Sequence, residues 1–225
     1  MNFLNLSSKK VAYNQAKAVI LPIPHGGSSK NIPLDKGPEA ILLASQMLSA
    51  YDVETNTDLD ELQLHTLEPL LCPDDPQAVV EEVANQSNPH FKKNKLVAAI
   101  GGSHLISEGL VNAALGQDNN LSVIHLGAHP HLLDSVADAP DVMARIKEKC
   151  PVSHIGIRSM AKAEKNKVHI DNLVFARDIY NNGLNAAADA IDVLGETVYL
   201  AINLDVLDPA LTPSSPWPVA LGKEG

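Results

Sequence analysis

The chain has 225 residues, of which 45% are hydrophobic and 20% charged, and this composition is typical of a globular protein with one sizeable core. Its 27 acidic and 17 basic side chains give a formal net charge of −10, which disfavours nucleic acids and anionic membranes as partners. We expect a cytoplasmic protein, because the sequence has two cysteines, no apolar run of membrane-spanning length and no signal-peptide pattern.

Short apolar runs alternate along the chain with segments of helical periodicity. The apolar runs predict strands over residues 17–24, 95–100, 121–126, 151–157, 172–176 and 197–205. Between the strands, apolar residues recur three and four positions apart, as they do in amphipathic helices. The predicted helices are residues 37–51, 75–86, 105–115, 139–149 and 183–194.

The predicted strands are almost continuously apolar, as in "LVAAI" at residues 96–100. Strands of a parallel sheet with helices on both faces have this pattern, whereas antiparallel strands more often alternate polar and apolar residues. We therefore predict a single domain over residues 1–225, with a three-layer α/β/α architecture and a mainly parallel sheet. Ligands of such sheets bind beyond the carboxyl ends of the strands, so polar residues there are site candidates.

The first candidate follows the strand at residues 95–100 and reads "GGSHLISEG". The two glycines permit a tight turn, and Ser103 can cap the helix that follows. His104 then lies at the start of the helix, near the edge of the sheet. The motif by itself is also compatible with a helix cap followed by a surface histidine.

The second candidate follows the strand at residues 121–126 and reads "GAHPHLLD". Residues two apart in an extended segment point the same way, so His129 and His131 can present their imidazoles to one point. Histidine is the common nitrogen ligand of transition metals, and the pair indicates a possible metal site. We expect His125, inside the strand, to be a core histidine.

The third candidate follows the last predicted strand and reads "NLDVLDPALTP". Asn203 and Asp205 are expected on the same side of the chain, and Asp205 offers an oxygen ligand. Asp208 before a proline is suited to a turn, and a turn-forming cluster is the alternative for the whole motif. Together the strand ends place histidines and a carboxylate at one edge of the sheet.

These motifs, in this order, resemble the metal-binding motifs of the ureohydrolase family of arginases, agmatinases and formiminoglutamases. The family patterns G-G-[DE]-H, D-A-H-x-D and D-x-D-x-x-D-P read here "GGSH", "GAHPH" and "NLDVLDP". The flanking segments "ILPIPHGGSS", "KGPEAILLAS", "HIGIRSM" and "FARDI" are also similar, most of all to those of agmatinases. The resemblance implies an arginase-like fold and hydrolysis of a guanidino compound, such as agmatine, to an amine and urea.

The resemblance also implies a site with two manganese ions, in which His104 binds one ion while His129 and Asp205 bind the other. Gly127 and Asn203, however, stand where the family has the two aspartates that bridge the ions. His131 replaces a further aspartate ligand. Of the aspartates that offset the repulsion of the ions, only Asp205 remains, so we expect no tight dinuclear cluster.

Other parts of the sequence also depart from the family. A histidine that agmatinases have before the helix at "VMARI" is absent, and the segment "PHGGSSKN" is altered. The chain ends at "SSPWPVALGKEG", where family members continue, so we expect a domain that is incomplete at its C-terminus. These departures predict lost or strongly reduced activity.

Two alternatives remain open. In the first, His104, His129, His131 and Asp205 form a remodelled site for a single divalent ion, for which zinc is the best match because the ligand set is rich in nitrogen. In the second, the chain is a non-catalytic regulatory or structural subunit of a ureohydrolase oligomer. If the protein is active, a small cationic guanidino substrate suits its acidic charge; in every case we expect an oligomer.

Overall fold

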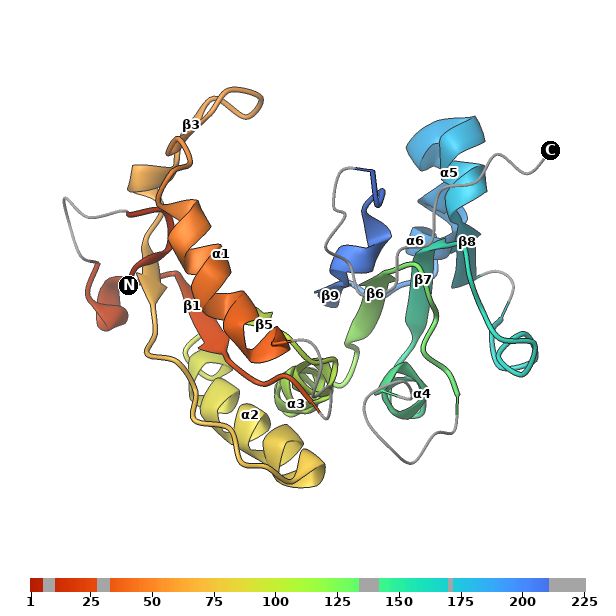
Figure 1. The fold of residues 1–225 in the computed structure, drawn as a ribbon, viewed down its shortest axis with the longest axis horizontal. Helices are drawn as coiled ribbons and strands as arrows, with labels where there is room; N and C mark the ends of the chain where they lie inside the picture. The colour runs from red at the N-terminus through yellow and green to blue at the C-terminus, as the bar shows by residue number, and fades with distance from the viewer. Residues whose placement is uncertain (6–10, 28–32, 134–141, 170–171, 211–225) are drawn as a thin grey trace. The chain divides into compact units, whose positions relative to one another are not determined.

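The computed structural model describes residues 1–5, 11–27, 33–133, 142–169 and 172–210 (Figure 1). Contacts within the chain divide it into two compact units, Met1–Gln117 and Asp118–Gly225. Three predicted features lie wholly or partly outside the described residues: half of the altered segment "PHGGSSKN", the start of the predicted helix at 139–149, and the stretch "SSPWPVALGKEG". Among the helices of the described residues, none is long and apolar enough to span a membrane.

The first unit contains a parallel three-stranded sheet in the order β4-β1-β5. Its strands are β1 (Ala18–Ile23), β4 (Leu64–Thr66) and β5 (Leu96–Gly101). The central strand β1 is buried from its second residue onward, which explains its continuous apolar sequence. A separate antiparallel pair is formed by β2 (Tyr51–Asp52) and β3 (Thr57–Asp58).

Three α-helices cover the sheet of the first unit: α1 (Gly37–Ser45), α2 (Pro76–Phe91) and α3 (Leu105–Leu115). Helix α2 begins after Asp75, whose side chain accepts a hydrogen bond of 2.8 Å from the N–H of Ala78. A proline follows at the first helical position, where its missing N–H is tolerated. Short 3-10 turns complete the unit: η1 (Phe3–Asn5), η2 (Tyr13–Gln15), η3 (Leu34–Lys36) and η4 (Leu59–Glu61).

The second unit contains a parallel four-stranded sheet in the order β8-β7-β6-β9. Its strands are β6 (Ser122–Leu126), β7 (Val152–Ile157), β8 (Leu173–Phe175) and β9 (Val198–Ile202). In the register of the sheet, His125 of β6 lies beside His154 of β7 and, on its other side, beside Ala201 of β9. The carboxyl ends of β6 and β9 therefore coincide.

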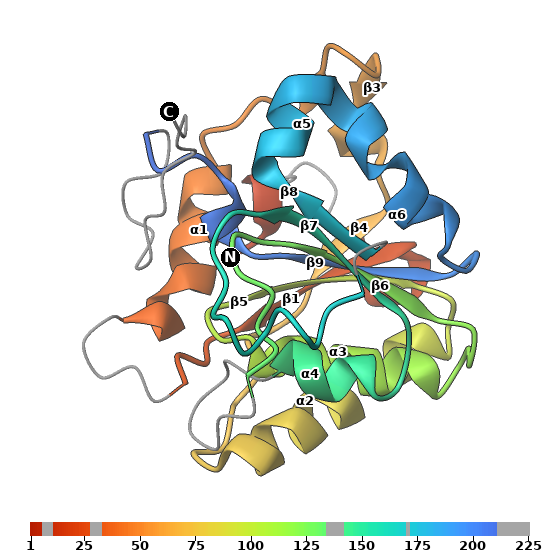
Figure 2. The same cartoon turned by 90° about the vertical axis from the view of Figure 1, so that its right-hand side faces the viewer.

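Helices cover both faces of this second sheet, as Figure 2 shows. On one face lies α4 (Val142–Lys147), and on the other lie α5 (Ala176–Asn182), the 3-10 turn η6 (Gly183–Ala187) and α6 (Ala188–Asp192). Ala187 and Ala190 pack with Ile155 and Val174 in a buried cluster. The three-layer arrangement thus follows from the apolar strands and the amphipathic helices.

The predicted α/β class with mainly parallel sheets is confirmed, and every predicted strand is present. The predicted helix at 37–51 is too long, because α1 ends at Ser45 and Tyr51 already belongs to β2. The predicted strand at 197–205 ends at Ile202, since Leu204–Val206 form the 3-10 turn η7. Strand β4 and helix α5 were missed. The single domain over residues 1–225 stays a prediction.

Candidate metal site at the strand ends of the second unit

The candidate site of the second unit begins where β6 and β9 end side by side. Leu126 and Ile202 are paired in the sheet, and the N–H of Asn203 donates a hydrogen bond of 2.8 Å to the carbonyl oxygen of Leu126. Gly127 and Asn203 therefore follow directly from paired positions. The side chains that follow the two strands therefore lie close together.

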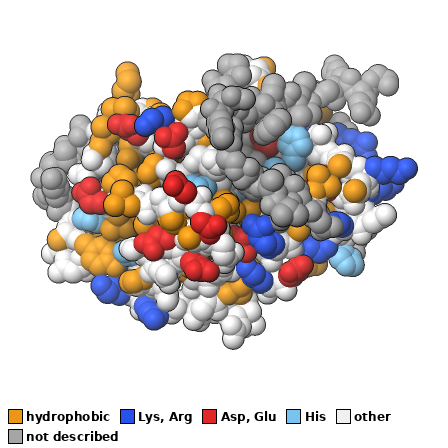
Figure 3. Space-filling model, turned by 60° about the horizontal axis from the view of Figure 1, so that its bottom comes forward, with side chains coloured by type: hydrophobic (Ala, Val, Ile, Leu, Met, Phe, Trp, Pro, Cys, Tyr) orange, Lys and Arg blue, Asp and Glu red, His pale blue; other side chains and the backbone are white. Residues whose placement is uncertain are grey.

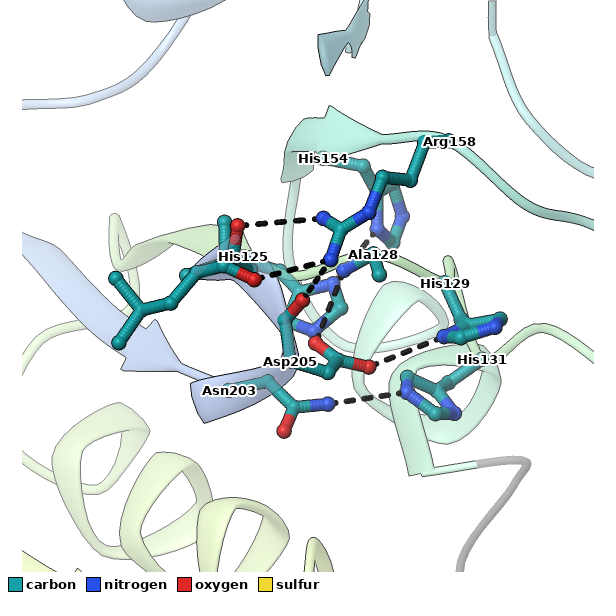
Figure 4. Close-up of polar contacts among 10 residues, drawn as sticks. His125, Ala128, His129, His131, His154, Arg158, Asn203 and Asp205 are labelled. Atoms are coloured by element: carbon teal, nitrogen blue, oxygen red, sulfur yellow. Dashed lines mark hydrogen bonds and ion pairs between the residues drawn. The ribbon is translucent and has the colours of Figure 1, made fainter. Parts of the chain in front are cut away.

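Asp205 is the centre of the site. It is buried in η7 and accepts two hydrogen bonds of 3.0 Å, one from Nδ1 of His129 and one from the N–H of Ala128 (Figure 4). Burial acts to raise the pKa of Asp205, but the hydrogen bonds from His129 and Ala128 outweigh it and hold the pKa below its usual value. Asp205 is therefore an ionised carboxylate at neutral pH.

His131 completes a group of three possible ligands. One ligand atom each of His129, His131 and Asp205 lie within 4.8 Å of one another. The amide nitrogen of Asn203 lies 3.3 Å from Nε2 of His131, so the amide faces the imidazole (Figure 4). The structure thus brings together three of the four predicted ligands.

His104, the fourth predicted ligand, belongs to the first unit, where it lies at the start of α3. The neighbouring Ser103 hydroxyl accepts a hydrogen bond of 3.3 Å from the N–H of Leu105, although His104 rather than Ser103 holds the cap position. The role of His104 as a metal ligand stays a prediction. The distances given above for the candidate site all join residues of the second unit.

His125 is fully buried, which confirms that it is a core histidine. Its Nδ1 lies 3.2 Å from Nδ1 of His154, its neighbour across the sheet. Burial, with a smaller effect of the Lys147 charge, lowers the pKa of His154 to about 4. His154 is therefore neutral at physiological pH, and the pair can share one ring N–H.

Gly127 leaves room for the His125 ring. A Cβ atom placed at position 127 would lie 2.7 Å from Nε2 and 2.8 Å from Cε1 of His125, closer than carbon atoms of this kind approach. His125 cannot move away freely, because it is buried and paired with His154. An aspartate at position 127 is therefore incompatible with the ring position seen here.

Arg158 and Glu164, which follow β7, support the site, although neither was predicted to belong to it. The guanidinium of Arg158 donates to the carbonyl oxygens of Asp205, Val206 and Leu207 (Figure 4). Glu164 is a buried carboxylate that accepts a hydrogen bond from the N–H of Leu132. A charged residue soon after a parallel strand was the available signal, since such residues reach the same sheet edge.

Comparison with known proteins identifies the class to which this fold and these strand ends belong. The sequence profile of the Arginase family matches residues 16–224, nearly the whole chain. The chain therefore belongs to the arginase family of ureohydrolases, and the resemblance seen in its motifs is confirmed.

Among its relatives are N(1)-aminopropylagmatine ureohydrolases. That of Synechocystis is 32% identical over 94% of this chain and 74% of the relative, and that of Thermus thermophilus is 29% identical over 97% and 78%. An agmatinase of Halalkalibacterium halodurans is 27% identical over 90% of this chain and 73% of the relative. The agmatine ureohydrolase of Thermoplasma volcanium has a similar fold, with a TM-score of 0.86 at 22% identity, covering 99% of this chain and 78% of that one.

The residues of this chain do not fit the pair of manganese ions that the family resemblance implies. Position 127 has neither a carboxylate nor space for one beside His125, and the Asn203 amide faces His131. Two divalent ions about 3.5 Å apart repel by roughly 20 kcal/mol at an effective dielectric constant of about 20. Within the described second unit, Asp205 is the carboxylate that remains to offset this repulsion.

Proposed function

We propose that this protein is an agmatinase-like member of the ureohydrolase family whose hydrolysis of guanidino compounds is lost or strongly reduced. The observation that carries the proposal is the contact between position 127 and the His125 ring, which would lie 2.7 Å from a Cβ atom there. The missing bridging carboxylate is thus not a simple deletion, because a buried ring occupies the space. Asn203 at the second bridging position is a neutral ligand and a poor bridge.

The substrate class follows from the relatives and from the charge of the chain. The relatives are named for agmatine and for N(1)-aminopropylagmatine, which are cationic guanidino compounds. A net charge of −10 suits such a ligand, and Figure 3 shows acidic side chains interspersed with hydrophobic ones on the face in view. We infer that any residual activity acts on this class, in a cytoplasmic oligomer without nucleic acid or membrane partners.

The test is a urea-release assay of the purified chain in excess manganese. Agmatine, N(1)-aminopropylagmatine and arginine are the substrates, and the Thermus thermophilus relative is the positive control. We expect no urea above background. A turnover number of about 1 per second or more, a value ordinary for enzymes, would contradict the proposal.

A second candidate function is a site for a single divalent ion, and the grouping of His129, His131 and Asp205 within 4.8 Å favours it. Two imidazoles and one carboxylate are a typical zinc ligand set, with a fourth position left for His104, as the sequence predicted, or for water. Such an ion would be structural if the set is closed and hydrolytic if water completes it.

Elemental analysis after incubation with zinc and desalting tests this second candidate. We expect about one zinc per chain and a loss of binding in Asp205→Ala, with Asp208→Ala as the matched control. Wild-type protein without bound zinc would rule the candidate out. The remaining alternative, a non-catalytic subunit, predicts co-elution with a full-length relative in sizing chromatography, and a monomer that ignores the relative would refute it.

A further inference from the structure

The backbone of His131 has a conformation that residues other than glycine rarely adopt. Its φ angle is +55°, in the left-handed region where a Cβ atom is crowded by the backbone. Histidine is found in this region more often than most residues other than glycine, but the conformation is still uncommon for it. Such strain persists only when the surroundings impose it, and it is concentrated at functional positions.

A buried carboxylate holds the backbone directly after His131. Oε1 of Glu164 accepts a hydrogen bond of 2.9 Å from the N–H of Leu132, the residue directly after His131. Oε2 of Glu164 accepts one of 2.7 Å from the N–H of Ala161. Glu164 is only 5% exposed and Leu132 only 1%. Moving Leu132 would expose its apolar side chain to water, and moving Glu164 would break a charge-assisted hydrogen bond.

The other side of the same loop is held by the segment that carries Glu164. The N–H groups of Arg158 and Ser159 donate to the carbonyl oxygen of Ala128, at 3.0 and 3.1 Å. The loop that presents the imidazoles is therefore fixed at Ala128 and again at Leu132. His131 lies directly before Leu132, so its backbone conformation must be compatible with both sets of hydrogen bonds.

We infer that Glu164 is a positioning residue: its buried carboxylate holds the Leu132 N–H, and thereby holds His131 in the left-handed conformation that turns its imidazole toward His129 and Asp205. Only the ion that the His131 imidazole would bind rests on the proposed function, namely on the single-ion candidate. The positioning itself needs no ion, since every contact that carries it lies within the chain.

The first test is free of metal and compares Glu164→Gln with Glu148→Gln, an exposed glutamate of the same unit. Glutamine keeps the shape of glutamate but has one oxygen for two N–H donors, so one of the two hydrogen bonds is lost. We expect the backbone 13Cα and 13Cβ chemical shifts and the ring shifts of His131 to leave their wild-type values in Glu164→Gln and to stay unchanged in the control. Unchanged His131 shifts in folded Glu164→Gln would overturn the inference.

The second test measures Co²⁺ affinity by absorption spectroscopy on the same proteins. Residues that orient a metal ligand typically change affinity by about 10- to 100-fold, so we expect at least a tenfold loss in Glu164→Gln and none in Glu148→Gln. A general loss of stability would lower the melting temperature but leave the affinity of the folded fraction unchanged, and that result would also overturn the inference.

The two tests separate this inference from the function on which it depends. If the wild-type protein binds no Co²⁺, the single-ion candidate fails, while the His131 shifts still decide whether Glu164 positions the loop. If Glu164→Gln does not fold, Glu164→Asp replaces it: the shorter carboxylate keeps its charge but cannot reach both N–H groups. We then expect shifted His131 resonances in the folded protein, and unchanged His131 resonances would overturn the inference.

Discussion

The ring Nδ1 of His129 and the carboxylate Oδ2 of Asp205 lie 3.0 Å apart, although 76 positions separate the two residues in the sequence. The second carboxylate oxygen of Asp205 is held by the N–H of Ala128. Both contacts form because β6 and β9 are neighbours in register and end at the same edge. The imidazole and the carboxylate are therefore prearranged by the fold and stabilise it.

Asp205→Asn should destabilise the protein by about 1–3 kcal/mol at pH 7, because a buried charge-assisted hydrogen bond is lost. The pKa of Asp205 is depressed in the folded state, so its contribution is present above the unfolded-state pKa and is lost as the pH falls through the folded value. Urea unfolding at neutral and acidic pH measures both effects. Glu196→Gln, at an exposed carboxylate, is the control, and equal stability of Asp205→Asn and wild type would contradict the prediction.

Gly127→Ala should lower the free energy of unfolding by about 1–3 kcal/mol, since the added Cβ atom meets the buried His125 ring. Gly116→Ala is a matched control, because its φ is −66° and its closest contact would be 3.3 Å. Thermal unfolding of both variants gives the comparison. Equal free energies of unfolding for Gly127→Ala and Gly116→Ala would contradict the prediction, because they would mean that the His125 ring shifts at little cost in free energy.

The same contact predicts that restoring the family aspartates is not sufficient. In Gly127→Asp/Asn203→Asp we expect a loss of stability and no gain of urea release, because His125 still occupies the space beside position 127. Adding His125→Ser should recover part of the stability by removing the ring. Urea release by the double variant at an enzyme-like rate would show that the ring yields to the new side chain.

Much of the fold could be predicted from the sequence because buried parallel strands are rich in apolar residues, and β1 is apolar throughout. Strand β4 was missed because "LHT" has no such run, and it forms through its pairing with β1. Helix α5 was missed because "ARDIYNN" lacks a clear apolar period. Pairing and packing, rather than local pattern, decide such short elements.

The candidate site could be predicted only in part. His129, His131 and Asp205 follow strand ends, and that rule alone predicted that they would meet. The roles of Arg158 and Glu164 depend on side-chain bonds to backbone groups of other segments, and no sequence spacing encodes such bonds. The positive φ of His131 is equally a product of tertiary context.

His154 should make the protein less stable as the pH falls from about 6.5 to about 4. Burial lowers the pKa of His154 to about 4 from the usual histidine value of about 6.5. The groups that face it are His125 on β6 and Lys147 on α4. Over this range the unfolded chain takes up a proton that the folded protein does not, so the free energy of unfolding decreases with falling pH, by about 3 kcal/mol.

His154→Asn tests this pH dependence, because asparagine can still contact His125 but does not titrate. Urea unfolding between pH 7 and pH 4 should show a shallower loss of stability in His154→Asn than in wild type. His169→Asn changes an exposed histidine of the same unit and should leave the slope unchanged. Identical slopes in wild type and His154→Asn would place the acid sensitivity elsewhere.

Arg158→Lys should loosen the turn that carries Asp205. The planar guanidinium donates to three successive carbonyl oxygens, those of Asp205, Val206 and Leu207, and a lysine ammonium cannot match that fork. We expect a destabilisation of about 1–2 kcal/mol from the lost hydrogen bonds. Locally, the N–H groups of Val206 and Leu207, which donate to Asn203 and Leu204, should exchange faster with deuterium.

Hydrogen–deuterium exchange of a peptide that covers η7 is the decisive measurement, because it separates local loosening from global unfolding. Arg177→Lys is the matched control: Arg177 is exposed and lies near Asp178 and over the Phe175 ring, away from these carbonyl groups. Exchange should accelerate in the η7 peptide of Arg158→Lys while peptides from β7 stay protected. Equal acceleration in both peptides would mean that Arg158 supports the whole unit rather than the turn. Unchanged exchange would contradict the prediction, and would mean that the packing of Val206 against Gly156 of β7 holds the η7 turn without Arg158.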